Sequence, residues 1–236
     1  EIEASRYEQQ LRKHRRALHR IPELGYEEIK THEYLMRHLE KLAPDDLRVF
    51  AQTGIRVVFR GDGTGRVIAF RSDIDALPIQ EATGCTFASE HSGRMHACGH
   101  DGHMANLLTF AQWLSEHRNQ LKDDVVLLFQ PAEETAFGAK AMIAEGVLNG
   151  VDAIYGAHIW GDFDAPYIDV SAGNRMACCD SFRIVVEGSS THGSTPHLGT
   201  DAIVAAASII MNIQTYVSRN NDPLNPLVVT VGKIDG

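Results

Sequence analysis

The 236-residue sequence has no apolar run long enough to cross a membrane. Its most apolar stretch, residues 202–211, is about half as long as a transmembrane helix requires. The charged segment at residues 1–16 also lacks the apolar centre of a secretory signal peptide. We therefore expect neither a membrane partner nor export, and we predict a cytoplasmic protein.

Basic residues and cysteines are both scarce. Lys and Arg total 22 against 31 Asp and Glu, which gives a formal net charge of −9 at pH 7. Nucleic acids and anionic membranes bind basic surfaces, so a nucleic-acid partner is not expected. Of the four cysteines, Cys178 and Cys179 are adjacent, unlike the framework of a disulfide-rich secreted domain. A reducing compartment and a small-molecule or protein partner fit this composition.

The order of secondary-structure patterns predicts the fold class. Apolar residues at helical spacing predict helices over 5–20 and 27–42, separated by IPELG. Segments 55–60 and 66–71 flank GDGTG, a pattern that predicts a β-hairpin. Beyond the hairpin we expect a helix at 102–118, a strand at 125–130, a helix at 137–148 and a strand at 151–159. This alternation predicts an α/β fold with a mainly parallel mixed sheet and helices on both faces.

The pattern changes after Asp180, where a second domain is expected. The remaining chain predicts a strand at 182–188, a polar loop, a helix at 200–219 and a strand at 227–234. This is a further βαβ unit. We therefore predict one domain over residues 1–180 and the beginning of a smaller domain over residues 181–236.

Candidate metal ligands are concentrated in MHACGHDGH, residues 95–103. Thiolate, imidazole and carboxylate groups bind Zn²⁺ and similar ions, and Gly99 lets Cys98 and His100 turn toward one ion. The alternative is the beginning of a helix whose histidines bind nothing and whose Asp101 caps the first turn. The cluster alone is suggestive of a metal site and does not exclude the alternative.

Two adjacent carboxylates follow the apolar strand VVLLFQ. Pro131 ends this strand, so Glu133 and Glu134 lie in the loop that leads to the next helix. Adjacent side chains in such a loop point differently, so one carboxylate can hold a metal while the other acts as a general base. Taken alone, the pair is more typical of acids in the first turn of a helix, where the helix dipole favours them.

Further candidates lie at the ends of two other predicted strands. His158 in GAHIW ends one strand, and Asp73 and Asp75 in SDIDALP follow another. Either aspartate can orient a metal-binding histidine, although Asp-x-Asp is equally typical of a turn. Ligands of open α/β sheets bind at the carboxyl ends of the strands, where these residues meet Glu133 and Glu134. The convergence of these loops is the stronger argument for a functional site.

In this order, the motifs RSDIDALP, MHACGHDGH, FQPAEE, GAHIW and THGSTPHLGTDAI resemble the M20 metallopeptidase family. The similarity is to its amidohydrolase branch, which cleaves N-acyl amino acids and includes hippurate and auxin-conjugate hydrolases. It extends from IPELGYEE to the last residue. The resemblance implies a zinc-exopeptidase-like catalytic domain over residues 1–180 and part of an α+β lid and dimerisation domain over residues 181–236.

The resemblance also implies roles for individual residues. It implies two divalent metal ions per active site, of Zn, Mn, Co or Ni, because a mixed N, O and S ligand set accepts several metals. Glu133 is implied to be the general base that acts on a metal-bound water, and Asp75 to support the ligands. Asp73 occupies a position that holds a histidine in other branches. The implied metal ligands are Cys98, His100, Glu134 and His158.

His192, in STHGSTPH, corresponds to a lid histidine of the family. In dimers this residue reaches the partner subunit's active site and supports the oxyanion, so the resemblance implies a homodimer or higher homo-oligomer. Taken alone, a histidine in such a loop is more typical of a surface position. The family continues beyond Gly236 with a segment that supplies a further histidine ligand, which leaves one expected ligand outside this sequence.

We therefore expect a metal-dependent hydrolase that cleaves the amide bond of an N-acyl amino acid, releasing a carboxylate and an amino acid. A dipeptidase or aminopeptidase on the same scaffold is an alternative, distinguished by recognition of a free α-amine. A non-catalytic, metal-binding or dimerising homologue or fragment is a further alternative. The expected partner is a small N-acyl amino acid or a short peptide.

Overall fold

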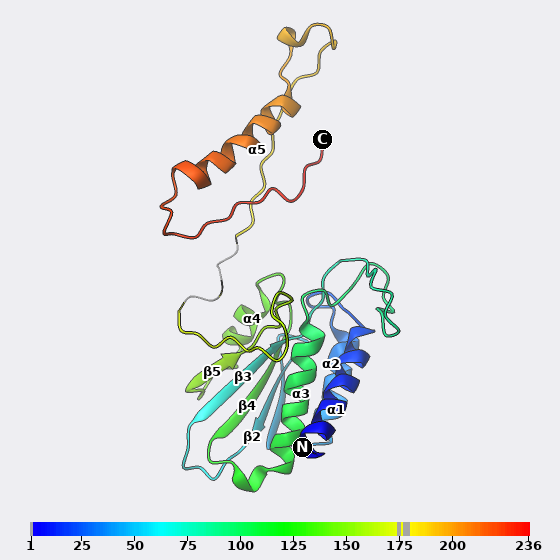
Figure 1. Cartoon of the computed structure of the whole chain (residues 1–236), viewed down its shortest axis with the longest axis vertical. Coiled ribbons are helices and arrows are strands. Elements are labelled where there is room, and N and C mark those ends of the chain that lie inside the picture. The colour runs from blue at the N-terminus through cyan, green and yellow to red at the C-terminus, as the bar shows by residue number, and fades with distance from the viewer. Residues whose placement is uncertain (1, 174–175, 177–179) are drawn as a thin grey trace. The chain divides into compact units, whose positions relative to one another are not determined.

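The computed structural model, drawn in Figure 1, describes residues 2–173, 176 and 180–236. They form two compact units, Glu1–Ile168 and Asp169–Gly236, and each unit is described by itself below. Cys178 and Cys179 lie outside the described residues. The functional division expected at residue 180 stays a prediction.

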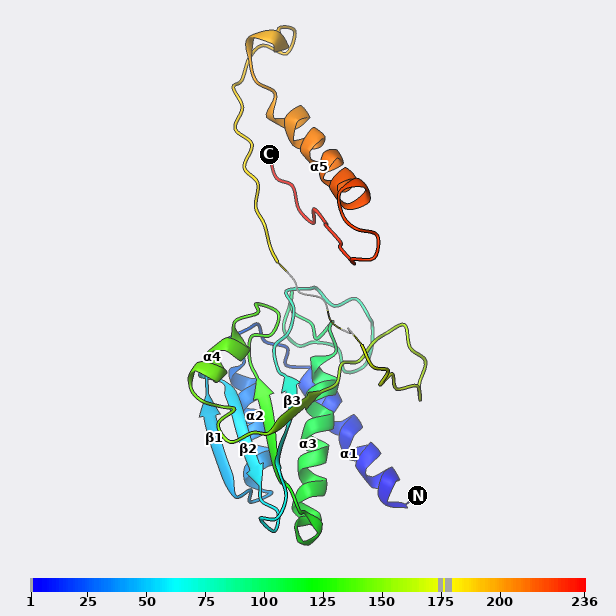
Figure 2. The ribbon, with the colours of Figure 1, turned by 90° about the vertical axis from the view of Figure 1, so that its left-hand side faces the viewer.

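The first unit is built on a five-stranded mixed sheet with the strand order β1-β2-β4-β3-β5. Figure 2 shows this sheet beside its helices. β4 and β5 run parallel to β3, whereas β2 is antiparallel to both β1 and β4. The predicted α/β sheet is confirmed, and its parallel part is β4, β3 and β5. The strands are β1 (Asp46–Phe50), β2 (Gly54–Phe59), β3 (Val67–Asp73), β4 (Asp124–Gln130) and β5 (Ala153–Gly156).

The predicted β-hairpin across GDGTG is wrong, because β4 lies between the two strands. Leu127 of β4 pairs with Val57 of β2 on one side and with Phe70 of β3 on the other. The six residues that end β4 are all buried, as a nearly continuous apolar run at the centre of a sheet requires. β1 is not among the predicted strands. Its residues are half-buried or exposed at the sheet edge, so it lacks the continuous apolar run that β4 has.

Helices cover both faces of the sheet, as predicted. On one face, Leu18, Leu35 and Leu108 from three helices share a core with inward-facing residues of β2 and β4. On the other face, Met142 packs with Val126 and Leu128 of β4. Successive residues of β4 therefore face different helices. The helices are α1 (Ile2–His19), α2 (Ile29–Glu40) and α3 (His100–Glu116) on the first face, and α4 (Gly138–Ala144) on the second.

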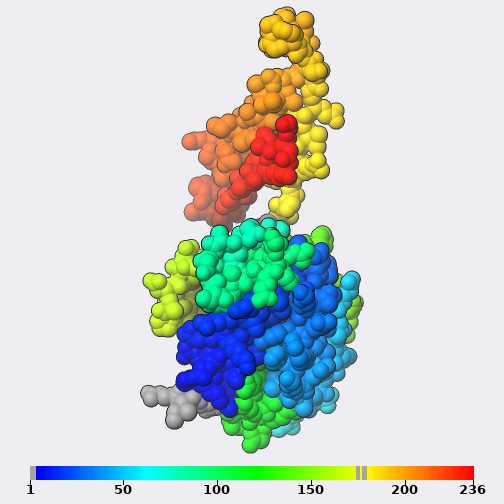
Figure 3. Space-filling model, turned by 90° about the vertical axis from the view of Figure 1, so that its right-hand side faces the viewer, coloured from blue at the N-terminus to red at the C-terminus, as the bar shows by residue number. Residues whose placement is uncertain are grey.

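The long loop between β3 and α3 covers the same end of the unit as the turn between α1 and α2, as Figure 3 shows. Among the hydrogen bonds that join the loop to that turn, three are accepted by backbone carbonyl groups of the turn. The loop therefore has a fixed position over the carboxyl end of the sheet. The bonds run from Ala76 N to Glu23 O (2.8 Å), from Glu90 N to Arg20 O (2.9 Å) and from His91 Nδ1 to Pro22 O (2.8 Å).

A buried histidine between α1 and α2 predicts a pH-dependent stability. The Tyr34 hydroxyl lies 2.8 Å from His14 Nδ1, and burial, reinforced by the positive charge of His38, lowers the pKa of His14 from 6.5 to about 4. The unfolded chain therefore binds this proton at a higher pH than the folded chain, so stability falls as the pH decreases from 6.5 toward 4.

We expect His14→Phe to remove this loss. Urea unfolding with a chelator present should show the stability difference between wild type and variant changing by up to about 1.4 kcal/mol per pH unit across this interval. Parallel pH profiles for the two proteins would contradict the assignment.

The second unit contains α5 (Ala202–Arg219) and a short 3₁₀ helix, Pro196–Leu198. Asp201 Oδ1 caps α5 by accepting from Ile203 N and Val204 N, each at 3.0 Å. The segments at 182–188 and 227–234, predicted as strands, are extended without forming strands. Within residues 180–236 the β-pairing is a single bridge, Ser189 to Thr200, and extended segments without a paired neighbour do not form a ladder.

No helix in the described part of the chain combines the length and the apolar character that crossing a membrane requires.

Candidate metal centre

The candidate site lies where the parallel strands of the first unit end. β3 ends at Asp73, β4 at Gln130 and β5 at Gly156, and these three carboxyl ends share one edge of the sheet. α3 begins at His100 beside them. The predicted ligands Cys98, His100, Glu134 and His158 come together here with Glu133 and Asp75.

His100 is oriented so that one ring nitrogen faces a group of acids. Its Nδ1 donates to the backbone carbonyl of Asp75 at 2.9 Å, which leaves the lone pair on Nε2. Nε2 lies 3.6 Å from Asp73 Oδ2, 3.7 Å from Glu134 Oε1 and 3.9 Å from Glu133 Oε2. This atom is buried and has no hydrogen-bond partner among the described residues. A buried lone pair that faces carboxylates is stabilised by a bound cation, so this donor set fits a divalent metal.

His158 presents its ring in the same way. Its Nδ1 donates to the carbonyl of Ile159 at 2.6 Å, and its Nε2 lies 3.4 Å from Cys98 Sγ. Donor atoms of Cys98, His100 and His158 all lie within 4.8 Å of one another, as do those of His100, Glu133 and Glu134. The two groups share His100, whose single free lone pair on Nε2 binds one ion, so together they form one continuous cluster of donor atoms.

The electrostatics of the site favour a bound cation. Burial, reinforced by the charge of Glu134, raises the pKa of the Cys98 thiol to about 12, and burial also raises the pKa of Glu134. Burial acts to lower the pKa of His100, but a hydrogen bond with Asp75 and the charges of the surrounding carboxylates outweigh burial. The pKa of His100 is therefore raised. The cluster therefore resists further negative charge and stabilises a positive one, which a metal ion supplies when it binds a thiolate.

The two adjacent glutamates have different environments. The Glu133 side chain is 38% exposed and the Glu134 side chain is 25% exposed. The backbone N–H of Glu134 donates to Asp75 Oδ2 at 2.9 Å, so Asp75 fixes this turn as well as the ring of His100. Glu133 is the carboxylate more accessible to a substrate.

His103 and Asp73 brace the loop that carries His158. His103 Nδ1 donates to Asp73 Oδ1 at 2.7 Å, and His103 Nε2 accepts from the backbone N–H of Ile159 at 2.8 Å. Both ring nitrogens are therefore engaged, although His103 forms a third candidate ligand group with Asp73 and His100. Burial acts to raise the pKa of Asp73, but the bond from His103 and nearby positive charge lower it to about 2.

The segment Pro131–Ala132, directly before the glutamates, has a strained and tightly packed backbone. Ala132 has φ of 49°, a left-handed conformation that costs about 1–3 kcal/mol for a residue with a side chain. Its N–H donates to Oε1 of the fully buried Glu28 at 2.9 Å. A Cβ on Gly138 would lie 1.6 Å from the carbonyl oxygen of Pro131, so only glycine fits at this contact with α4.

Glu28 was not predicted as part of the site. Its other carboxylate oxygen, Oε2, accepts from the Thr53 hydroxyl at 2.8 Å, which fixes the carboxylate between α2 and the β4 loop. A single glutamate at a helix start gives no local signal of this long-range contact. Its place in IPELGYEE, within the family resemblance, is the one sequence feature that could have identified it.

His192 belongs to the second unit. Its Nδ1 accepts from the backbone N–H of Ser194 at 3.2 Å and lies 2.8 Å from the Ser194 hydroxyl oxygen, so the ring proton is on Nε2. The side chain is exposed. Its implied role at the active site stays a prediction.

Comparison with known proteins adds a family match. The family model described as Peptidase family M20/M25/M40 matches residues 69–223. N-acetyl-L-cysteine deacetylase of Bacillus subtilis (strain 168) is 43% identical over 235 residues, which are 100% of this chain and 56% of that protein. IAA-amino acid hydrolase ILR1-like 2 of Arabidopsis thaliana is 43% identical over 222 residues, 94% of this chain and 50% of that protein.

A solved structure is similar to this chain as well. The Bacillus subtilis YXEP protein, described as a dinuclear metal-binding peptidase from the M20 family, superposes with a TM-score of 0.64. It is 44% identical, and the superposition covers 67% of this chain and 45% of that protein. The chain therefore spans about half the length of the relatives it matches.

Proposed function

Because the chain belongs to Peptidase family M20/M25/M40, we propose that it forms the metal-binding catalytic part of an amidohydrolase that converts N-acyl amino acids into a carboxylate and an amino acid. Relatives named as a deacetylase and an amino acid hydrolase support this reaction class. The observation that carries the proposal is the buried Nε2 of His100, which faces three carboxylates without a hydrogen-bond partner among the described residues.

Four residues would hold the metal ions: Cys98, His100, Glu134 and His158. A pair of ions is supported by the YXEP protein, which is described as a dinuclear metal-binding peptidase, and by the number of donor atoms gathered around His100. Sulfur, nitrogen and oxygen donors together suit Zn, Mn, Co or Ni. When bound, such ions polarise the substrate carbonyl and lower the pKa of water at the site.

Glu133 is the proposed general base. Its carboxylate accepts a proton from the attacking water and then delivers this proton to the leaving amine, so the side chain returns to its initial state. Its partial exposure and the 3.9 Å between its Oε2 and His100 Nε2 support this assignment. Asp75 would act as a positioning residue, since it holds both His100 and the Glu134 turn.

The remaining assignments rest on the resemblance. Residues 1–180 would form the catalytic domain, and residues 181–236 would form part of a lid through which the protein makes a homodimer or higher homo-oligomer. His192 would support the oxyanion in the partner subunit's active site. A cytoplasmic location is part of the same proposal and is supported by the scarcity of cysteine.

The test is hydrolysis of N-acetyl and N-benzoyl amino acids and of unblocked dipeptides, before and after metal removal and again after metal is restored. We expect cleavage of the acylated compounds that disappears with the metal and returns with it. Cleavage of dipeptides alone would contradict the proposed reaction and support the dipeptidase or aminopeptidase alternative. Absence of turnover in a chain that retains bound metal would support the non-catalytic alternative.

A further inference from the structure

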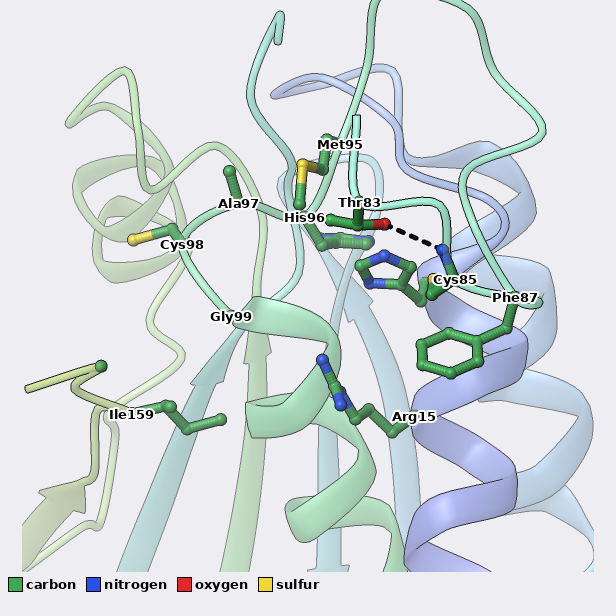
Figure 4. Close-up of a pocket in the computed structure, with 12 residues that line it drawn as sticks. Arg15, Thr83, Cys85, Phe87, Met95, His96, Ala97, Cys98, Gly99 and Ile159 are labelled. Atoms are coloured by element: carbon green, nitrogen blue, oxygen red, sulfur yellow. Dashed lines mark hydrogen bonds between the residues drawn. The ribbon is translucent and has the colours of Figure 1, made fainter. Parts of the chain in front are cut away.

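A cavity of about 400 Å³ in the first unit lies beside the cluster around His100. Cys98 and Cys85 both line it, and they occupy opposite sides in Figure 4. Cys98 belongs to the proposed catalytic site, whereas Cys85 lies in the loop between β3 and α3. His19, at the end of α1, also lines the cavity, and near it lies Glu81. The side of the cavity away from Cys98 therefore has its own group of donors.

The donor atoms of these three residues have the spacing of a metal site. His19 Nε2 lies 3.3 Å from Glu81 Oε1, and Cys85 Sγ lies 3.6 Å from the same oxygen. Tetrahedral Zn²⁺ with ordinary bond lengths separates nitrogen from oxygen by about 3.3 Å and oxygen from sulfur by about 3.5 Å. The remaining pair, His19 and Cys85, lies within 4.8 Å. A small movement of one side chain therefore completes the geometry.

The ring of His19 is already oriented for a ligand role. Its Nδ1 lies 2.8 Å from Asp101 Oδ2, and the exposed fractions of the two side chains are 4% and 1%. Arg15 Nε donates to the same oxygen at 3.2 Å. A histidine whose far nitrogen is bonded to a carboxylate is the usual arrangement of a metal-binding imidazole, because the carboxylate fixes the ring and increases its basicity.

Glu81 is also oriented by its surroundings. The backbone N–H of Ser89 donates to Oε2 at 2.6 Å, and the Thr83 hydroxyl donates to Oε1. Its side chain is 3% exposed, so the carboxylate is buried where Oε1 faces both His19 and Cys85. A carboxylate oxygen that binds a metal can retain such a hydrogen bond, because it has more than one lone pair.

From these contacts we propose a second metal site, formed by His19, Glu81 and Cys85, that binds Zn²⁺ or a similar divalent ion. Imidazole, carboxylate and thiolate are the ligand types that Zn²⁺ accepts, and the adjoining cavity has room for a water as the fourth ligand. The site lies outside the proposed catalytic residues, so it goes beyond the proposed function.

A metal at this site would join parts of the chain that are distant in the sequence. It would link the end of α1 to the loop between β3 and α3. Through the bond from His19 to Asp101, it would also brace the first turn of α3, which carries His100. We assign the site a structural role, because its ligands hold elements in place and do not include Glu133.

Co²⁺ binding to the full chain tests this proposal, because a thiolate bound to Co²⁺ gives a charge-transfer band in the near ultraviolet. Cys98→Ser removes the thiol of the catalytic cluster and should leave a band that is due to Cys85. The double variant Cys98→Ser/Cys85→Ser should lose that band. In the wild-type background, Cys85→Ser should lower the Zn²⁺ content by one ion per chain.

These variants distinguish the proposed site from the catalytic one. Cys98→Ser leaves the Cys85 thiol in place, and Cys85→Ser leaves the Cys98 thiol in place. Glu81→Gln keeps the shape of the side chain and should weaken Zn²⁺ binding at this site at least about tenfold. It also serves if Cys85→Ser does not fold, which circular dichroism reveals. A band equally strong in Cys98→Ser and in the double variant, or no band in Cys98→Ser, would overturn the proposal. His19 would then be a protonated imidazole held between Asp101 and Glu81.

Discussion

Replacement of Glu133 by glutamine is expected to lower kcat at least about a hundredfold, because the amide cannot accept a proton from the attacking water. Glutamine keeps the size of the side chain, so substrate binding should change little. KM for an N-acyl amino acid should therefore stay close to the wild-type value, and kcat should carry the loss. Steady-state kinetics on the metal-loaded protein measure both quantities.

Metal content decides how this result is interpreted. Glu133 is both the proposed base and a member of a possible ligand group with His100 and Glu134. A base that binds no metal predicts equal metal content in Glu133→Gln and wild type. Glu33→Gln, which removes the same charge from an exposed position on α2, is the matched control and should keep full activity. Unchanged kcat in Glu133→Gln would contradict the assigned role.

Replacement of His100 by alanine is expected to have the largest effect on metal binding. Both candidate donor groups contain His100, so its loss removes the donor atom that the two groups have in common. We expect the affinity of the cluster for Zn²⁺ to fall at least about a hundredfold, since loss of a supporting contact alone costs 10- to 100-fold. Calorimetric titration of the metal-free protein measures the change.

A second histidine provides the control for this variant. His32 Nδ1 donates to the carbonyl of Thr53 at 2.8 Å, just as His100 Nδ1 donates to a backbone carbonyl. His32→Ala therefore removes a comparable ring and hydrogen bond from a place outside the cluster. Its Zn²⁺ affinity should equal that of wild type. Equal affinities in the two variants would remove His100 from the ligand set.

The sequence allowed prediction of features that depend on local pattern. Apolar spacing located α1, α2 and α3 to within a few residues, and the apolar run at 125–130 identified the strand β4. Residues that follow parallel strands meet at one edge whatever the rest of the fold does. For this reason the sequence alone predicts that Glu133, Glu134 and His158 lie close together.

Features that depend on distant pairing were not predicted. β2 and β3 are separated by a glycine-rich turn, and local pattern alone favours a hairpin, yet each strand pairs with the buried strand β4. The contact from Glu28 to Ala132 joins residues 104 positions apart. The candidate ligand group of His19, Glu81 and Cys85 likewise comes from two separate segments of the chain. Neither segment by itself has the residue spacing of a metal-binding motif.

The left-handed Ala132 and its contact with Gly138 also bear on when conformational freedom is lost. The residue before Glu133 is fixed by the buried Glu28 carboxylate, and the adjacent carbonyl of Pro131 is covered closely by α4. The backbone entropy of this turn is therefore lost when the protein folds. Little backbone entropy remains to be lost when Glu133 accepts a proton. The activation barrier of the reaction therefore has a smaller entropic part than it would have if the same carboxylate lay on a mobile loop.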